Sequence, residues 1–164
     1  MIMIVAADEK WGIGINGDLL TPLPEDMKFF REKTRDSVII MGRKTLLSFP
    51  NGKPLKNRVN IVITTDKNFS EEGCIVCHNI EEAVLISKNY TDKDVFVVGG
   101  GTVYRQMLKY CDTAYITKLY KTFDEADTFI NNLDIMEEWV VAEESELKEY
   151  DGLNFRFVTY KRTK

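Results

Sequence analysis

Runs of consecutive apolar residues alternate with segments of helical periodicity through the first two thirds of the chain. An apolar run without polar alternation is typical of a strand that is buried on both faces, so this pattern predicts parallel strands with helices on each side of a sheet. The predicted strands are residues 2–7, 37–41, 58–64, 75–77 and 95–98. The predicted helices are residues 24–34, 43–48 and 80–88 and a segment opened by the glycines after Val98.

The last third of the chain has a different pattern. Residues 113–119, 139–143 and 155–161 are predicted strands with no convincing helix between them, and Tyr150-Asp151-Gly152-Leu153 is typical of a turn. Consecutive strands joined by turns pair in antiparallel fashion. The sequence therefore predicts one α/β domain, residues 1–164, whose mainly parallel sheet ends in antiparallel strands.

Composition and charge narrow the class of protein. A chain of 164 residues with 44% hydrophobic and 11% aromatic content fits one domain with a substantial core. The net charge is −4, and the 22 basic and 26 acidic residues are mixed along the chain, so no basic stripe is available for a nucleic-acid backbone. The opening MIMIVAAD is too short for a membrane span and lacks the basic flank of a signal peptide. We expect a cytoplasmic protein with no nucleic-acid or membrane partner.

The segment GCIVCHN holds Cys74, Cys77 and His78 in the order that attaches c-type haem. No export signal accompanies it, and the same residues have the alternation and β-branched content of a short strand. Together with Cys111, these cysteines are interpreted as reduced thiols of a cytosolic protein. His78 is the sole histidine, and no metal centre is expected.

The run from Val95 to Leu108, VFVVGGGTVYRQML, joins a buried strand to a helix through three glycines. Backbone N–H groups at such a helix start can face an anion, usually a phosphate. The run is not the dinucleotide fingerprint, because Tyr104 occupies the position of its third glycine. A tight strand-to-helix connection without a ligand is the alternative interpretation.

Two other strands end in residues suited to phosphate. VIIMG continues into Gly42-Arg43-Lys44-Thr45, and NIVITT ends in Thr64 and Thr65. Because ligands of parallel sheets bind at the carboxyl ends of the strands, these endings and the glycines can converge on one extended, phosphorylated ligand such as a dinucleotide. Taken singly, Arg43 and Lys44 would be ordinary solvated helix charges.

The segment LTPLPEDMKFFREKT predicts a helix that presents Asp26 and Phe30 on one face. A carboxylate beside aromatic surface suits a flat, nitrogen-rich heterocycle, since its two oxygens can accept paired N–H donors from an amidine-like edge. The alternative is that Glu25 and Asp26 only complement the positive end of the helix.

These segments occur in an order that resembles the dihydrofolate reductase family over essentially the whole chain. The resemblance is carried by IVAAD, WGIGINGDLL, LPEDMKFF, VIIMGRKT, RVNIVITT, VFVVGGGTVY, and ITKLY followed by DEADTF. It implies a central mixed sheet of eight strands and hydride transfer from NADPH to 7,8-dihydrofolate, in support of one-carbon metabolism and thymidylate synthesis. It also implies a monomer and inhibition by diaminopyrimidine or pteridine antifolates.

The resemblance also implies roles for individual residues. Asp26 would hold the pterin ring with Thr117 as its hydroxyl partner, and the active-site loop around Leu19 would move to admit water. Arg58 would bind the glutamate carboxylate of the substrate. The pterin and benzoyl pockets would be lined by Val5, Ala6, Leu19, Phe30, Phe49, Leu55 and Val98. The coenzyme would contact Ala7, Ile13, Gly42, Arg43, Lys44, Thr45, Thr64, Thr65, Val98, Gly99, Gly100, Gly101, Thr102, Val103 and Tyr104. The family places a cis peptide between Gly99 and Gly100.

Three positions depart from the family pattern. Leu20-Thr21-Pro22 stands where many members have Pro-Trp, Leu19 stands where methionine is frequent, and Thr102 replaces a basic residue found in some relatives. These departures concern loop closure, inhibitor preference and the strength of the preference for NADPH. Two alternatives stay open: a reductase of similar fold that acts on a pyrimidine precursor of riboflavin, and a nucleotide-binding regulatory module without catalysis.

Overall fold

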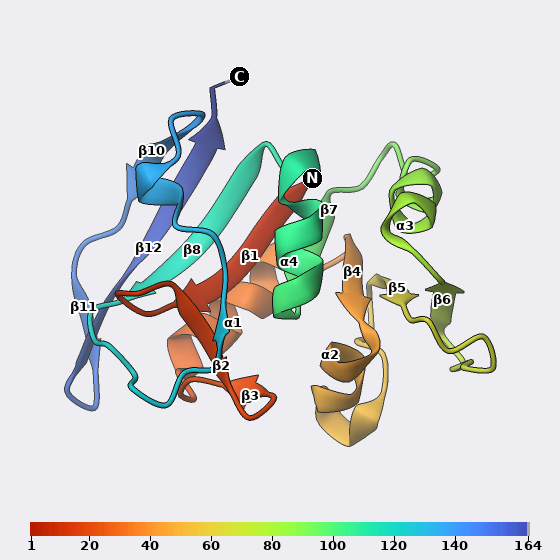
Figure 1. Ribbon diagram of the computed structural model, residues 1–164, viewed down its shortest axis with the longest axis horizontal. Helices are drawn as coiled ribbons and strands as arrows, with labels where there is room; N and C mark the ends of the chain where they lie inside the picture. The colour runs from red at the N-terminus through yellow and green to blue at the C-terminus, as the bar shows by residue number, and fades with distance from the viewer. Residues whose placement is uncertain (164) are drawn as a thin grey trace.

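A mixed sheet runs through the centre of the computed structural model, which describes residues 1–163 (Figure 1). Lys164, which the sequence analysis included in the domain, lies outside the described residues. The strand order is β10-β12-β8-β1-β7-β4-β5-β6, and β11 pairs with β12. The strands are β1 Ile2–Ala7, β4 Val38–Gly42, β5 Val59–Ile63, β6 Cys74–Cys77, β7 Val95–Gly99, β8 Thr113–Leu119, β10 Trp139–Glu144, β11 Lys148–Tyr150 and β12 Leu153–Arg162.

Neighbouring strands from β8 to β6 are parallel, whereas β12 pairs antiparallel with β8, β10 and β11. The predicted α/β class and mixed, mainly parallel sheet are therefore confirmed. The predicted limits of β1 and β8 match the observed ones, and those of the other predicted strands differ by at most two residues. The predicted turn joins β11 to β12, with Asp151 and Gly152 both at positive φ.

Helices cover both faces of the sheet, which explains why strand β4 is apolar at every position. Val38 and Ile40 belong to the core cluster that includes Val103 of α4, Gly101–Met107, and Ala83 of α3, Ile80–Ser87. Ile39 and Met41 pack in a second cluster, with Leu46 of α2, Arg43–Ser48, and the aromatic residues Phe29 and Phe30 of α1, Pro24–Thr34. In Figure 1, α4 crosses in front of β1 and α1 lies behind the sheet.

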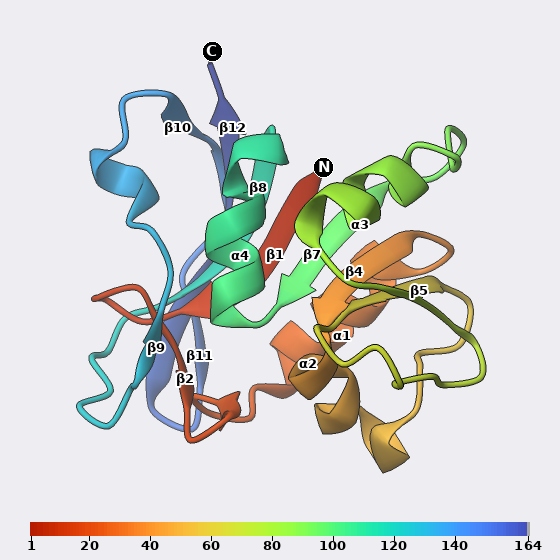
Figure 2. The same ribbon diagram turned by 45° about the vertical axis from the view of Figure 1, so that its right-hand side comes forward.

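A second, smaller sheet was not predicted. It has the order β3-β2-β9 and consists of β2 Gly12–Ile15, β3 Asp18–Leu19 and β9 Thr128–Phe129 (Figure 2). Its strands are short, and β2 pairs with β9 across more than a hundred residues, for example Gly14 with Thr128. Short-range patterning carries little signal for such pairing. The missed strand β11 is also short.

Three short 3₁₀ helices complete the secondary structure: η1 Pro50–Gly52, η2 Leu108–Tyr110 and η3 Leu133–Ile135. Within residues 1–163, every helix is too short or too polar to cross a membrane.

Candidate active site

The carboxyl ends of the parallel strands bring most of the predicted site residues to one edge of the sheet. Register places Gly42 at the end of β4 beside Ile63 of β5, and Met41 beside Gly99 of β7. On the other side of β1, Ala6 lies opposite Thr117 of β8. Ligands of open α/β sheets bind at this edge, so the side chains that reach it are candidates for a binding site.

Asp26 and Thr117 meet across the site. The Thr117 hydroxyl on β8 donates a hydrogen bond of 2.5 Å to Oδ1 of Asp26, in the first turn of α1. Pro24 begins that helix, and the buried Leu23 before it packs in a cluster with Leu119 and Phe155, which fixes where α1 starts. Burial raises the pKa of Asp26, and the hydrogen bond from Thr117 opposes this shift. A carboxylate with one free oxygen therefore faces the site.

Asp26 lines a small pocket whose other walls come from β1, β8 and the loop that precedes α1. The lining residues are Ala6, Ile13, Leu19, Leu20, Thr21, Leu23, Asp26 and Leu119. Three predicted residues, Ala6, Ile13 and Leu19, are thus brought together with Asp26. Leu19 is 66% exposed, so its side chain can be covered by a ligand.

The predicted apolar wall is largely assembled in one cluster. Phe30, Phe49, Leu55 and Val98 belong to or pack against one core cluster, between the sheet and helices α1 and α2. Val5 differs, because its side chain packs against the other cluster, on the side of α4. Only the backbone of Val5 is then available to the wall formed by the other residues.

Two strand ends meet at the glycine turn. The peptide bond between Gly99 and Gly100 is cis, as the family resemblance implies. A Cβ on Gly99 would lie 3.2 Å from the Thr45 hydroxyl oxygen, and one on Gly42 would lie 3.4 Å from Cγ2 of Val103. Because these glycines have no side chains, the turn after β7 can approach the start of α2. The groups available to a ligand at this point are then backbone atoms and the Thr45 hydroxyl.

Tyr104 connects the glycine turn with the half of the site that holds Asp26. Its buried hydroxyl donates a 2.7 Å hydrogen bond to the carbonyl oxygen of Ile4 in β1, and a Cβ on Gly99 would lie 3.5 Å from its ring. Burial strongly raises the pKa of Tyr104, and the negative charge of Asp26 adds to the shift. The hydroxyl is therefore a permanent donor that fixes the ring.

Arg43 and Thr64 form the outer end of the site. Nη1 of Arg43 lies 3.2 Å from Oδ2 of Asp66, and its guanidinium carbon lies 4.9 Å from the ring centroid of Phe69. The Thr64 hydroxyl accepts a hydrogen bond from the Asp66 backbone. Lys44, Thr65 and Thr102, also predicted to contact the coenzyme, are exposed, whereas the predicted contacts Ala7, Gly101 and Val103 are buried.

His78 is a candidate that the sequence analysis set aside as a strand residue. It follows β6 directly, and its Nδ1 lies 2.8 Å from the carbonyl oxygen of Thr64. The signal that could have found it is its position after a parallel strand, at the same edge as Thr64.

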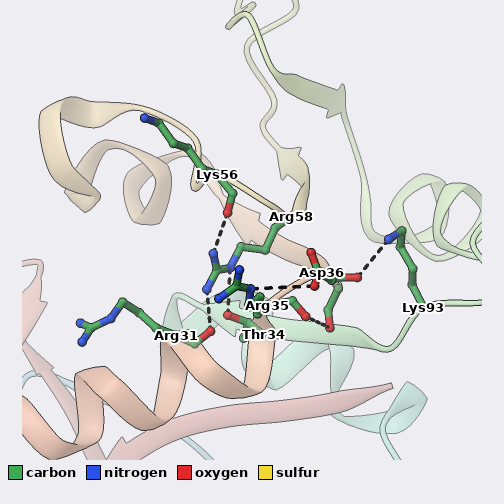
Figure 3. A network of polar contacts seen from close by, with 8 residues as sticks. Arg31, Thr34, Arg35, Asp36, Lys56, Arg58 and Lys93 are labelled. Atoms are coloured by element: carbon green, nitrogen blue, oxygen red, sulfur yellow. Dashed lines mark hydrogen bonds and ion pairs between the residues drawn. The ribbon is translucent and has the colours of Figure 1, made fainter.

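Arg58 lies at the far end of α1 (Figure 3). Its guanidinium donates to the Thr34 hydroxyl at 3.1 Å and to the carbonyl oxygens of Lys56 and Arg31 at 2.6 and 2.7 Å. Partial burial lowers the pKa of Arg58, and the nearby cation of Arg35 lowers it further. A guanidinium carries five N–H donors, so this anchored group keeps donors for a carboxylate.

The loop before α1 is fastened to the segment around β9. The Asn16 backbone donates to Oδ2 of Asp127 at 2.8 Å, and the Asp127 backbone donates to the carbonyl oxygen of Gly14 at 2.9 Å. The hydrogen bond from Asn16 is the main cause of the lowered pKa of Asp127. These bonds hold the exposed tip of the loop, including Leu19, above the Asp26 pocket.

Comparison with known proteins identifies this arrangement. A family model described as dihydrofolate reductase matches residues 1–162. The chain is 35% identical to a dihydrofolate reductase of Staphylococcus haemolyticus over 162 residues, covering 98% of this chain and 94% of the relative. It is 33% identical to that of Bacillus subtilis over 160 residues, covering 97% and 92%. A solved structure of dihydrofolate reductase from Enterococcus faecalis, complexed with NADP(H) and RAB-propyl, is similar with a TM-score of 0.84 and 32% identity, covering 99% and 96%.

Proposed function

The chain belongs to the dihydrofolate reductase family, and we propose that it transfers a hydride from NADPH to 7,8-dihydrofolate to give 5,6,7,8-tetrahydrofolate. The observation that carries the proposal is the half-buried Asp26 carboxylate, which is hydrogen-bonded by Thr117 and lines a pocket with Ala6 and Leu19. One oxygen of Asp26 is engaged by Thr117. The carboxylate can thus accept paired N–H groups from the pterin edge while its orientation stays fixed.

The substrate would extend from Asp26 toward Arg58 along α1. The aromatic and aliphatic wall of Phe30, Phe49 and Leu55 would pack against the pterin and benzoyl rings. Arg58 would bind the glutamate carboxylate, since its guanidinium is already fixed by the end of α1.

The residues on the other side of the site fit an extended, phosphorylated coenzyme. Hydroxyls of Thr45, Thr64 and Thr65 and the cations of Arg43 and Lys44 supply donors and positive charge for its phosphates. The side chains missing at Gly99 and Gly100 leave room for close approach to the backbone beside Thr45. When bound, NADPH supplies the hydride. Arg43 and Lys44 would favour NADPH over NADH by pairing with its additional phosphate.

Asp26 would stabilise the positive charge that develops when the neighbouring imine nitrogen of the substrate is protonated. Asp26 would bind the pterin ring at some distance from that nitrogen. A water molecule is therefore the immediate proton donor in this proposal. The exposed Leu19, on the loop above the pocket, would control the access of that water.

The same pocket would bind diaminopyrimidine or pteridine antifolates, because their amidine-like edge matches the Asp26 carboxylate. We further propose that the whole chain acts as one catalytic domain and as a monomer. A cytoplasmic role in one-carbon metabolism and thymidylate synthesis would follow from its product.

A turnover assay tests this function. The purified protein should oxidise NADPH only when dihydrofolate is added, with no added metal or flavin and with no effect of a chelator. A pyrimidine precursor of riboflavin should not replace dihydrofolate. Turnover with the pyrimidine alone would favour the related reductase, and binding of NADPH without turnover on either substrate would favour a regulatory module.

A further inference from the structure

The first residue after β1, Asp8, is a buried carboxylate that the reaction described above does not use. Only 3% of the surface of this residue is accessible to solvent. Oδ1 accepts hydrogen bonds from the backbone N–H groups of Lys10 and Gly12 at 2.9 and 2.8 Å, and Oδ2 accepts one from Phe123 at 3.0 Å. A buried carboxylate is costly unless its oxygens are paired, and here backbone donors occupy both of them.

The surroundings are shaped to admit this carboxylate. A Cβ on Gly12 would lie 3.1 and 3.2 Å from the two Asp8 oxygens. The Asp8 backbone also closes a tight turn, donating to the carbonyl oxygen of Gly12 and accepting from the N–H of Trp11, which has a φ of 62°. None of the ion pairs found within residues 1–163 involves Asp8.

The three hydrogen bonds join two separate parts of the active site. Lys10 and Gly12 belong to the start of the loop that carries Ile13 and Leu19 into the Asp26 pocket. Phe123 follows β8, the strand that presents Thr117 to Asp26. A backbone bond from Glu9 to the carbonyl oxygen of Lys121, 3.1 Å long, lies beside this connection.

We propose that Asp8 is a positioning residue for hydride transfer: its carboxylate fixes the base of the active-site loop to the segment after β8. The proposal rests on the proposed function. Asp127 fastens the exposed tip of the same loop, whereas Asp8 holds its base inside the protein. The base therefore keeps Ile13 in place with Ala6 at the pocket wall.

The variant Asp8→Asn separates the two connections that this carboxylate makes, one within the loop and one to the segment after β8. The amide oxygen can still accept from Lys10 and Gly12, but the amide nitrogen then faces the N–H donor of Phe123, so the connection to β8 is lost while the local turn is retained. Asp92→Asn is the matched control, because Asp92 is exposed and the substitution removes the same charge.

We expect Asp8→Asn to lower the single-turnover rate of hydride transfer by about 10-fold, since a misplaced loop costs rate through geometry. The dissociation constant for dihydrofolate should change by less than about 2-fold, because Asp26, Thr117 and Arg58 are untouched. Amide hydrogen exchange at Phe123 should accelerate in this variant and not in Asp92→Asn. A lowered melting temperature with unchanged hydride transfer and unchanged Phe123 exchange would overturn the proposal.

A second measurement needs no variant. In the unmodified protein, NADPH should slow amide exchange at Gly12 and at Phe123 together, since one carboxylate holds both N–H groups. Slower exchange in the loop alone, with Phe123 unaffected, would also overturn the proposal. If the unmodified protein fails to oxidise NADPH with dihydrofolate, the proposed function fails; if it turns over normally and Asp8→Asn matches it, only the positioning role fails.

Discussion

The two ends of the active site are built in different ways. At the Asp26 end, one half-buried carboxylate meets one buried hydroxyl, and the surrounding walls are apolar. At the Arg43 end, the charged groups are exposed: the side chains of Arg43 and Asp66 are 44% and 41% accessible to solvent. Polar groups at that end are also spread over three strand ends, those of β4, β5 and β6.

This difference determines how much each residue can contribute. Electrostatic interactions strengthen in a desolvated pocket and weaken where water and salt screen them. A single side chain at the Asp26 end should therefore carry a large part of the transition-state stabilisation. At the Arg43 end, several residues should share a smaller, more nearly additive contribution to coenzyme affinity.

The largest effect is expected for Asp26→Asn. The variant keeps its size and can still accept the hydrogen bond from Thr117, but it loses the charge and turns one acceptor into a donor. Turnover at neutral pH should fall by roughly 10²–10⁴, while NADPH affinity should barely change. Activity should recover as pH falls, because substrate protonated in solution bypasses the missing charge. Neutral-pH turnover within about 2-fold of the parent would refute the role of Asp26, since this is well under 1 kcal/mol of barrier.

The same variant should not be destabilised. Burial raises the pKa of Asp26 in the folded protein because the ionised carboxylate is disfavoured there. The contribution of this shift to the free energy of unfolding is therefore present at low pH and is lost as the pH rises through the raised pKa. Asp26→Asn should therefore unfold at the same or a higher temperature than the parent at neutral pH, with a difference that shrinks toward acid. Thermal unfolding across this pH range, without ligands, measures it. A large loss of stability at neutral pH would show that the lost activity reports misfolding.

Thr117→Val tests the contribution of the second polar group at the same end of the site. It removes the hydroxyl that donates to Asp26 and leaves the charge in place. A hydrogen bond to a charged group contributes about 1.5–3 kcal/mol, so kcat/KM should fall by about 10- to 100-fold. The pKa of Asp26 should rise further, because the bond that opposes the effect of burial is gone. An NMR titration of the Asp26 carboxyl that shows no upward shift would contradict this account.

A smaller, selective effect is expected at the other end. Replacing both Arg43 and Lys44 by alanine should raise the KM for NADPH by about 10-fold and leave the KM for NADH nearly unchanged, because only NADPH carries the additional phosphate. Turnover at saturating NADPH should stay close to that of the parent. Equal losses for the two coenzymes would show that these cations do not recognise that phosphate.

The smallest effect is expected for Cys77→Ser. Cys77 is buried in β6, its thiol lies 3.7 Å from the carbonyl oxygen of Val62, and burial raises its pKa to about 11. A thiol so reluctant to ionise is a poor nucleophile, and a serine hydroxyl can occupy the same place. Reductase activity should remain within about 2-fold of the parent. Covalent haem attached in cells that mature cytochromes would contradict the interpretation that Cys74, Cys77 and His78 have no redox or haem-binding function.

The two ends also differ in how far the sequence alone could predict them. Apolar runs predicted the buried strands, and the family resemblance paired Asp26 with Thr117, two residues that a hydrogen bond joins in the structure. The pairing of β2 with β9 in the small sheet escaped prediction because these two strands lie more than a hundred residues apart in sequence. His78 and Asp8 were missed for a related reason. Their partners, the Thr64 carbonyl and the Phe123 N–H, are backbone groups whose positions depend on the completed fold.

The central claim is that one pocket orients dihydrofolate so that a hydride passes directly from NADPH to it. Turnover with NADPH carrying deuterium at the transferring position of its nicotinamide ring tests this most directly, with the product analysed by mass spectrometry and NMR. We expect tetrahydrofolate with one deuterium at the newly reduced ring carbon, and much slower formation of this product in Asp26→Asn at neutral pH. Oxidation of NADPH without deuterium in the product, or equal labelling rates in parent and variant, would contradict it.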